Sequence, residues 1–462
     1  MNRRTAKTAL LAWGLLLSLL FSGTGTPRVA ALEPSAETLT PIQHFIVLMQ
    51  QNHSFDNYFG TYPGADGFPA NTCMPSNFPD ERTQTCVKPF HLETYPVVDM
   101  PHNAQVFNME YDGGLMDGFV RTIRTHNLDG ALAMAYYDSR EIGYYWGLAG
   151  QYVLFDRYFS SAQAGSVPNR MFWISGQPGV TTNNIPSQGF GSMPTIFDEL
   201  QAKGISWKYY VANYDPTINY RSLAKLSYLP PQVQWVPLLS FDRFIDDPTL
   251  SSHIVDLSQY YKDLQNGTLP AVSFVTLQGG ISEHPATDIR QGVRVVKSMI
   301  QALMESNAWS SSAFLLTYDE AGGWYDHVVP PQVDGYGYGF RVPALLVSPY
   351  ARQGFVDHTV LDHTSSLKFI ERNWGVSALA SRDAAAHDFL SAFDFNGAAR
   401  DPAFVPFLPS PQTPTREPSR PAIYLSYGGG LFLAVLLIMF AALRERWVQR
   451  SKPRDLPEDS SR

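Results

Sequence analysis

Two adjacent carboxylates, Asp319 and Glu320, end the apolar run 313–319 and precede two glycines and the pair Asp326–His327. Neighbouring carboxylates repel each other unless a proton or a cation lies between them. Hard divalent cations favour such oxygen ligands, and a bound cation with an open position polarises a phosphoryl or carbonyl oxygen. The segment therefore favours a metal site at a strand end over the alternative, a solvated acidic turn.

Ser166 is the candidate nucleophile. Gly165 precedes it, and Pro168 to Arg170 are typical of the start of a helix, whose N-terminus favours an anion. Arg170 could then add a bidentate contact to that anion. A serine needs a base or a metal to become a nucleophile, and no G-x-S-x-G elbow surrounds Ser166, so a metal is the better activator. On local sequence alone, an ordinary N-cap serine is the favoured alternative.

Histidines add a second set of candidates. A histidine can protonate a leaving oxygen, bind a metal or hold a phosphoryl oxygen, although a single one is more often a structural hydrogen-bonding residue. Four of the 11 histidines stand near acids in predicted loops: His102, His284, His327 and His363.

An amide-rich stretch, LMQQNHSFDNYFG at 48–60, leaves the apolar run 44–50. It places Gln51, Asn52 and His53 at the tip of a predicted strand. A turn, a sugar-binding loop and half of a metal site all fit this composition.

Short apolar runs and helical patterns alternate along the chain, which predicts an α/β fold with a doubly wound, mostly parallel sheet sandwiched by helices. The polar clusters follow the runs 44–50, 271–277 and 313–319, and ligands gather at the carboxyl ends of such strands. Segments 61–130 and 213–260 are expected to be loop-rich insertions. The predicted strands are 44–50, 152–159, 204–212, 271–277, 313–319 and 342–349, and the predicted helices are 192–204, 289–306 and 364–375.

The composition indicates a large folded core. Of the 462 residues, 44% are apolar and 16% are charged, and the net charge of −8 includes no basic stripe. Disorder and nucleic-acid binding are therefore disfavoured.

Both ends of the chain carry membrane signals. A basic start and an apolar run predict a signal peptide at 1–31, by the twin-arginine or the general route. A proline-rich stalk at 401–421 leads to a predicted transmembrane helix at 422–443, with a buried soluble helix as the alternative. The basic tail 444–462 would stay in the cytoplasm, so the domain 41–400 would be extracytoplasmic. Cys73 and Cys86 suit that oxidising compartment and could form a disulfide.

Five motifs, in order, resemble the bacterial phosphoesterase family, which contains phospholipases C and related acid phosphatases within the alkaline phosphatase superfamily. The resemblance covers 41–375, and the motifs are IQHFIVLMQQNHSFDNYFGTYPG, FSSAQAGSVPNR, TIFDEL…GISWKYY, SEHPATDIRQG and TYDEAGGWYDHVVPP. It implies hydrolysis of a phosphate ester, either a phospholipid or a phosphomonoester, by an alkaline-phosphatase-like fold.

The resemblance also implies roles for individual residues. One divalent metal ion would lie among Gln51, Asn52, Ser166, Asp319 and Glu320, with Ser166 also forming a phosphoryl-enzyme. His102 and His284 match family histidines that contact the phosphoryl group, and Arg170, His327 and His363 would contact substrate.

The chain departs from the family at two positions of the first motif. Gln51 stands where the family usually has Glu, and His53 where it usually has Arg. Loss of one negative charge predicts weaker metal binding or a different cation preference, with His53 as a possible compensation and a degenerate site as the extreme case. Ser166 stands where the lipases often have Thr, which favours a phosphomonoester as the substrate.

Two alternatives remain open. SVPNR also fits the S-x-P-x-R pattern of sulfatases, although Gln51–Asn52 replaces the Asp–Asp pair that sulfatases use. A membrane-tethered binding protein with a degenerate site is the second alternative, because fold alone does not fix function.

Overall fold

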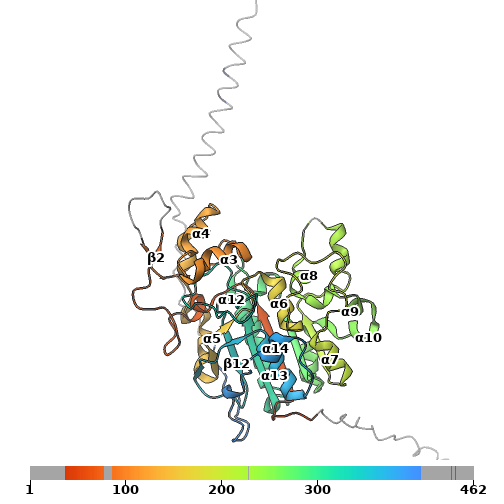
Figure 1. Ribbon diagram of the computed structural model, residues 1–462. Coiled ribbons are helices and arrows are strands. Elements are labelled where there is room, and N and C mark those ends of the chain that lie inside the picture. The colour runs from red at the N-terminus through yellow and green to blue at the C-terminus, as the bar shows by residue number, and fades with distance from the viewer. Residues whose placement is uncertain (1–36, 77–85, 227, 407–438, 440–442, 444–462) are drawn as a thin grey trace, which may run out of the picture. The chain divides into compact units, whose positions relative to one another are not determined.

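The centre of the fold is an eight-stranded sheet in the order β13-β6-β12-β11-β1-β10-β8-β9 (Figure 1). Its strands are β1 (His44–Gln50), β6 (Val153–Phe155), β8 (Trp207–Val211), β9 (Ile254–Asp256), β10 (Val272–Thr276), β11 (Ser312–Tyr318), β12 (Ala344–Val347) and β13 (Phe355–Asp357). Parallel pairing joins β11, β1, β10, β8 and β9, and also β13 and β6, whereas β12 runs antiparallel to both of its neighbours. The predicted α/β fold with a mostly parallel sheet is confirmed.

This computed structural model describes residues 37–76, 86–226 and 228–406, together with Met439 and Leu443. Within the described residues, no helix is long and apolar enough to cross a membrane. Several predicted segments lie outside the described residues. They are the signal peptide (1–31), the part of the stalk after residue 406, the transmembrane helix (422–443) except for Met439 and Leu443, and the cytoplasmic tail (444–462).

Helices flank the sheet. They are α2 (Phe55–Phe59), α3 (Ala104–Tyr111), α4 (Phe119–Thr125), α5 (Ser139–Gln151), α6 (Ser166–Ser175), α7 (Ile196–Ala202), α8 (Pro231–Trp235), α9 (Asp242–Asp246), α10 (Pro248–Ser251), α11 (Ser258–Asn266), α12 (Ile289–Met304), α13 (Thr364–Trp374) and α14 (Ser381–Ala385). α13 packs against α6 and α14, while α12 packs against α5 and α11. Figure 1 shows α13 and α14 in front of the sheet.

The longest of these helices, α12, illustrates how sequence pattern sets the packing. Asp288 accepts a hydrogen bond from the backbone N–H of Arg290 and so caps the helix N-terminus. The buried side recurs every three to four residues, as an amphipathic helix requires. Its members are Ile289, Gly292, Val293, Val296, Met299, Ile300, Leu303 and Met304.

The register of the central strands places their last residues at one edge. Gln50 pairs with Tyr318 across β1 and β11, and Met49 pairs with Thr276 across β1 and β10. The residues that follow these three strands therefore emerge side by side, at the carboxyl ends where ligands bind in such sheets.

The predicted insertions hold mostly short elements. Residues 61–130 include α3, α4 and the two-residue strands β2 (Met74–Pro75), β3 (Cys86–Val87) and β4 (Phe90–His91), and β4 pairs with β5 (Ala135–Tyr136). The Cys73–Cys86 disulfide is present, with the Cα atoms 5.4 Å apart. In residues 213–260, α8, α9 and α10 precede the edge strand β9, which sequence analysis missed.

Candidate active site

Asn52 and Asp319 connect the ends of β1 and β11. The backbone N–H of Asn52 donates to Oδ1 of Asp319 at 3.1 Å, and both residues are fully buried. Asn52 adopts a left-handed conformation with φ of 59°. Asparagine tolerates this conformation better than most residues, and such outliers cluster at functional sites. The strand ends therefore bring two predicted metal ligands into direct contact.

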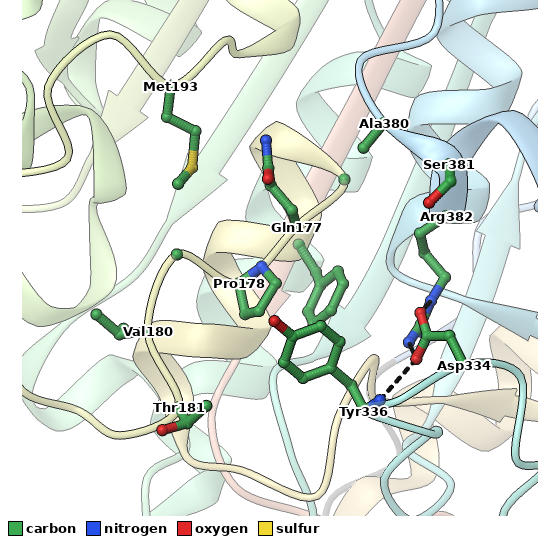
Figure 2. Close-up of a pocket in the computed structure, with 13 residues that line it drawn as sticks. Gln177, Pro178, Val180, Thr181, Met193, Asp334, Tyr336, Ala380, Ser381 and Arg382 are labelled. Atoms are coloured by element: carbon green, nitrogen blue, oxygen red, sulfur yellow. Dashed lines mark hydrogen bonds and ion pairs between the residues drawn. The ribbon is translucent and has the colours of Figure 1, made fainter.

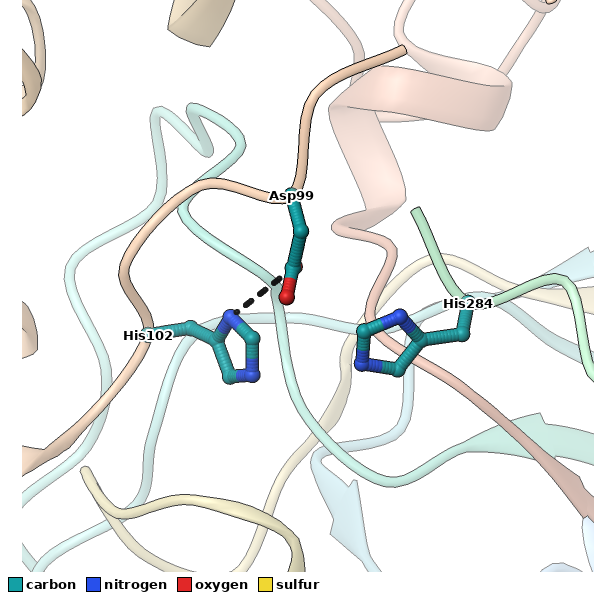
Figure 3. Close-up of side chains that lie close together, drawn as sticks. All are labelled: Asp99, His102 and His284. Atoms are coloured by element: carbon teal, nitrogen blue, oxygen red, sulfur yellow. Dashed lines mark ion pairs between the residues drawn. The ribbon is translucent and has the colours of Figure 1, made fainter. Parts of the chain in front are cut away.

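The side-chain amide of Asn52 faces two histidines. Its Nδ2 lies 3.0 Å from Nε2 of His102 and 3.3 Å from Nε2 of His284. Figure 3 shows these two imidazoles facing each other, with Asp99 beside His102. Because the amide nitrogen is committed to the histidines, the amide oxygen must point elsewhere, and Oδ1 of Asn52 is buried without a hydrogen-bond partner.

Backbone carbonyls fix the tautomers of both histidines. Nδ1 of His102 lies 2.6 Å from the carbonyl oxygen of Met100, and Nδ1 of His284 lies 2.8 Å from that of Pro285. A carbonyl only accepts hydrogen bonds, so each Nδ1 carries the proton. Nε2 of each neutral ring is then an acceptor for the Asn52 amide, and a protonated ring could donate from the same atom.

The acidic pair lies beside this group. Oε2 of Glu320 accepts the backbone N–H of Gly322 at 2.6 Å, and Oε1 of Glu320 lies 3.9 Å from Nε2 of His102. Gly322 has a φ of 67°, and a Cβ there would lie 2.3 Å from the backbone oxygen of Asn52, so only glycine fits. Burial and the nearby Asp319 raise the pKa of Glu320 well above its usual range.

Three of the predicted metal ligands carry an unpaired buried oxygen. Oε1 of Gln51, Oδ1 of Asn52 and Oε1 of Glu320 are all buried without a hydrogen-bond partner among the described residues. Leaving a buried polar atom unpaired costs free energy, so such a group needs an explanation. Amide and carboxylate oxygens are the donors that a hard divalent cation prefers. The residues present therefore fit a metal ion.

Ser166 begins α6 and is almost fully buried. Arg170, one turn later on the same helix, donates from Nε to Oδ2 of Asp319 at 3.2 Å. Residues four apart share a face of a helix, so Ser166 lies on the side of α6 that faces the end of β11. Asn183 accepts the backbone N–H of Val167 at 2.9 Å and so caps this helix start.

Arg170, which is predicted to contact substrate, has its guanidinium enclosed by other parts of the protein. Its guanidinium is fully buried, and every N–H group has an acceptor. Besides Asp319, the acceptors are the backbone oxygens of Met49, Gln50 and Trp235 and the hydroxyl of Thr276. Arg170 therefore orients Asp319 and joins α6 to β1 and β10.

His327 and His363 also make contacts with other parts of the protein. Nδ1 of His327 lies 2.7 Å from Asp56 and its Nε2 lies 3.3 Å from Asp66, so both ring nitrogens are occupied. His363 is fully buried, with Nε2 lying 3.0 Å from the backbone oxygen of Asp319. Burial lowers the pKa of His363 to about 4. Both ring nitrogens of His327 thus contact carboxylates, whereas Nδ1 of His363 is buried without a hydrogen-bond partner among the described residues.

Sequence reasoning missed three neighbours of the site. Trp235 stacks on His284 with ring centres 5.8 Å apart, Asp99 lies 3.5 Å from Nδ1 of His102, and the buried Glu283 directly precedes His284. The SEHP motif contained Glu283, but its burial depends on contacts with distant segments. No local pattern marks Trp235, which comes from the insertion 213–260.

A separate cavity lies at the far end of α6. It has a volume of about 470 Å³ and is lined by residues that include Phe172, Gly176, Tyr336 and Arg382 (Figure 2). Arg382 is already paired with Asp334 there, at 2.6 Å. None of the predicted site residues lines this cavity, so it is distinct from the group around Asn52.

Comparison with known proteins supports the predicted resemblance. Phospholipase C B of Mycobacterium tuberculosis is 29% identical over 431 residues, which cover 78% of this chain and 79% of that protein. Hemolytic phospholipase C of Pseudomonas aeruginosa is also 29% identical, over 84% of this chain and 61% of that protein. Among solved structures, a protein in the alkaline phosphatase superfamily from Vibrio parahaemolyticus aligns with a TM-score of 0.37 and 11% identity, over 77% of this chain and 75% of that one.

Residues 42–377 match the Phosphoesterase family, in close agreement with the range over which the motifs show the resemblance. The matched region contains Asn52, Ser166 and the Asp319–Glu320 pair. The protein therefore belongs to the phosphoesterase family and is a hydrolase that acts on phosphoester bonds.

Proposed function

We propose that the protein is an extracytoplasmic, metal-dependent phosphoesterase that works through a phospho-Ser166 intermediate. The observation that supports this most is the orientation of Asn52. Its amide nitrogen faces Nε2 of His102 and His284, while its amide oxygen is buried without a hydrogen-bond partner among the described residues. In this proposal, the amide oxygen of Asn52 binds the cation, and its amide nitrogen contacts the two histidines that hold the phosphoryl group.

The metal ligands in this proposal are Gln51, Asn52, Ser166, Asp319 and Glu320. A divalent cation bound there would stabilise the alkoxide of Ser166 and the charge that develops on the transferred oxygens. Arg170 and the backbone N–H of Asn52 hold Asp319 in place, and Gly322 holds Glu320 through its N–H. Asp319 and Glu320 are therefore held in fixed orientations by the protein.

The reaction proceeds in two displacements. Oγ of Ser166 attacks phosphorus, the bond from phosphorus to the leaving oxygen breaks, and the leaving alcohol takes up a proton. Water then attacks the phosphoryl group, the bond to Oγ breaks, and Ser166 regains its proton. His102 and His284, whose Nδ1–H groups are held by carbonyls, present Nε2 to hold phosphoryl oxygens or to exchange protons.

The substrate is a phosphate ester. Relatives named phospholipase C favour a phospholipid, whereas Ser166 in the second motif favours a phosphomonoester. The disulfide Cys73–Cys86 supports an extracytoplasmic location, because disulfides persist in oxidising compartments. Membrane attachment through residues 422–443 remains part of the proposal.

The test is a substrate panel on the purified full-length protein, with metal content measured on the same samples. The panel contains phosphatidylcholine, an aryl phosphate, an aryl phosphodiester and an aryl sulfate. We expect a phosphate ester to be hydrolysed, activity to be lost on chelation and activity to return with a divalent cation. Hydrolysis of the sulfate alone would contradict the proposal, as would inactivity on all four substrates at saturating cation.

A further inference from the structure

We propose that Glu283 is a positioning residue for His284, acting through the backbone of the turn that both residues share. This inference rests on the proposed role of His284 in the reaction. Glu283 is fully buried, and the hydrogen-bond partners of its carboxylate are one glutamine and three tyrosines outside the proposed ligand set, so it is not a catalytic residue.

Four donors surround the Glu283 carboxylate. Oε1 accepts hydrogen bonds from Nε2 of Gln50, at 2.9 Å, and from the hydroxyl of Tyr145. Oε2 accepts from the hydroxyls of Tyr58, at 2.9 Å, and Tyr318, at 2.6 Å. Two donors on each oxygen match the hydrogen-bonding capacity of a carboxylate and reduce the cost of its burial.

These donors connect the turn that contains Glu283 and His284 to the strands that end at the site. Gln50 directly precedes Gln51, and Tyr318 directly precedes Asp319. The Glu283 side chain therefore connects the ends of β1 and β11 to the segment after β10. Through it, the position of His284 is set relative to the proposed metal ligands.

The backbone of Glu283 explains why such an anchor is needed. Glu283 has a φ of 62°, in the left-handed region that glutamate rarely adopts, and Ala286 in the same turn has a φ of 72°. Such conformations are energetically unfavourable and persist only when surrounding contacts enforce them. Without its anchor, Glu283 would relax towards an ordinary φ, and the next residue, His284, would move.

Further contacts hold the same turn. The backbone oxygen of Glu283 lies 2.8 Å from Nε2 of His53. The helix α12 passes so close that a Cβ on Gly292 would lie 2.3 Å from Cγ of Glu283. Nε2 of His284 in turn contacts the Asn52 amide, so displacement of the turn would separate His284 from Asn52.

The first test compares Glu283→Gln and Tyr145→Phe with the control Tyr144→Phe. Glu283→Gln keeps shape but replaces an acceptor with a donor, and Tyr145→Phe removes one hydroxyl. Tyr144 is the buried neighbour of Tyr145 on α5 and is not a donor to Glu283. A displacement of about 1 Å can reduce turnover on the order of 100-fold. We expect a fall in kcat of that order for Glu283→Gln, a smaller one for Tyr145→Phe and none for Tyr144→Phe.

Further readouts separate positioning from a general loss of structure. Metal content and KM should change little, while the imidazole ¹⁵N resonances of His284 should shift in Glu283→Gln and Tyr145→Phe but not in Tyr144→Phe. Unchanged His284 resonances in a folded Glu283→Gln protein would overturn the inference. Because Tyr145→Phe removes a single oxygen, it serves as the test if Glu283→Gln does not fold.

A double-mutant cycle with His284→Ala is the decisive arm. If Glu283 acts through His284, Tyr145→Phe and Glu283→Gln should cost little further activity once His284 is absent. Equal losses with and without His284 would overturn the inference even if His284→Ala itself is strongly impaired. Full activity of His284→Ala would instead refute the role of His284 in the proposed function, which is a distinguishable failure.

Discussion

The backbone N–H of Asn52 donates to the carboxylate of Asp319 across 267 residues of sequence, at 3.1 Å. This contact joins the loop after β1 to the loop after β11. It places the amide-rich segment and the acidic pair on the same edge of the sheet. The local sequence of either segment does not show that the other is its neighbour.

Replacing Asp319 should affect metal binding and stability separately. Asp319→Asn keeps the size of the side chain and should reduce cation affinity roughly 10- to 100-fold or more, because a charged ligand is lost. Asp319→Ala should also lower the free energy of unfolding by about 3–5 kcal/mol, since the buried charge of Arg170 then loses its ion-pair partner. Titration calorimetry with the cation and chemical denaturation measure the two effects. Unchanged cation affinity in Asp319→Asn would contradict its assignment as a ligand.

Arg170→Met should act on stability more than on substrate binding. Removal of the guanidinium leaves Asp319 buried without its ion pair, and we expect a loss of about 3–5 kcal/mol in the free energy of unfolding. Arg221→Met is the control, because Arg221 forms exposed ion pairs with Asp242 and Asp246, which contribute about 0–1 kcal/mol. A stable Arg170→Met protein with only a raised KM would instead support the predicted contact of Arg170 with substrate.

Gln51→Glu tests the departure from the family pattern. A carboxylate at this buried position adds negative charge to the proposed ligand set, so cation affinity should rise roughly tenfold or more. Gln51→Met, which keeps the length of the side chain but removes its oxygen, should lower the affinity. Equal affinities in all three proteins would show that residue 51 is not a ligand.

His327 should make stability depend on pH. Burial lowers its pKa, but the hydrogen bond and charge of Asp56 outweigh this, so the pKa is raised above its usual value of about 6.5. A raised pKa in the folded state adds stability that is fully present below about pH 6.5 and is lost as pH rises through the folded-state pKa. His327→Gln should therefore cost more stability at pH 6 than at pH 9, as measured by denaturant titration. The same cost at both pH values would contradict this.

The sequence pattern predicted the strands that border the site more accurately than the strands at the two edges of the sheet. The run 44–50 coincides with β1, and 271–277 and 313–319 each differ from β10 and β11 by one residue at each end. These strands are buried on both faces and read as continuous apolar runs. The edge strands β9 and β13 have only three residues each, too few to show a period.

The individual site residues were predicted unevenly, for a physical reason. Asn52, Asp319 and Glu320 follow strands, so sheet topology alone brings them together. Arg170 and His327 carry charge or polarity that suggests substrate contact, yet their partners are carboxylates from distant segments. Glu283 was overlooked because its donors, such as Tyr58 and Tyr145, come from separate helices.

The central claim is that Ser166 carries the phosphoryl group, and intact-mass analysis of acid-quenched reactions tests it most directly. Peptide mapping should locate an added phosphoryl group on Ser166 after reaction with an aryl phosphate, or a phosphoryl head group after reaction with a phosphatidylcholine. Ser166→Ala should fold, lack the adduct and show no turnover. A Ser166→Ala protein that hydrolyses these substrates at the wild-type rate would contradict the account.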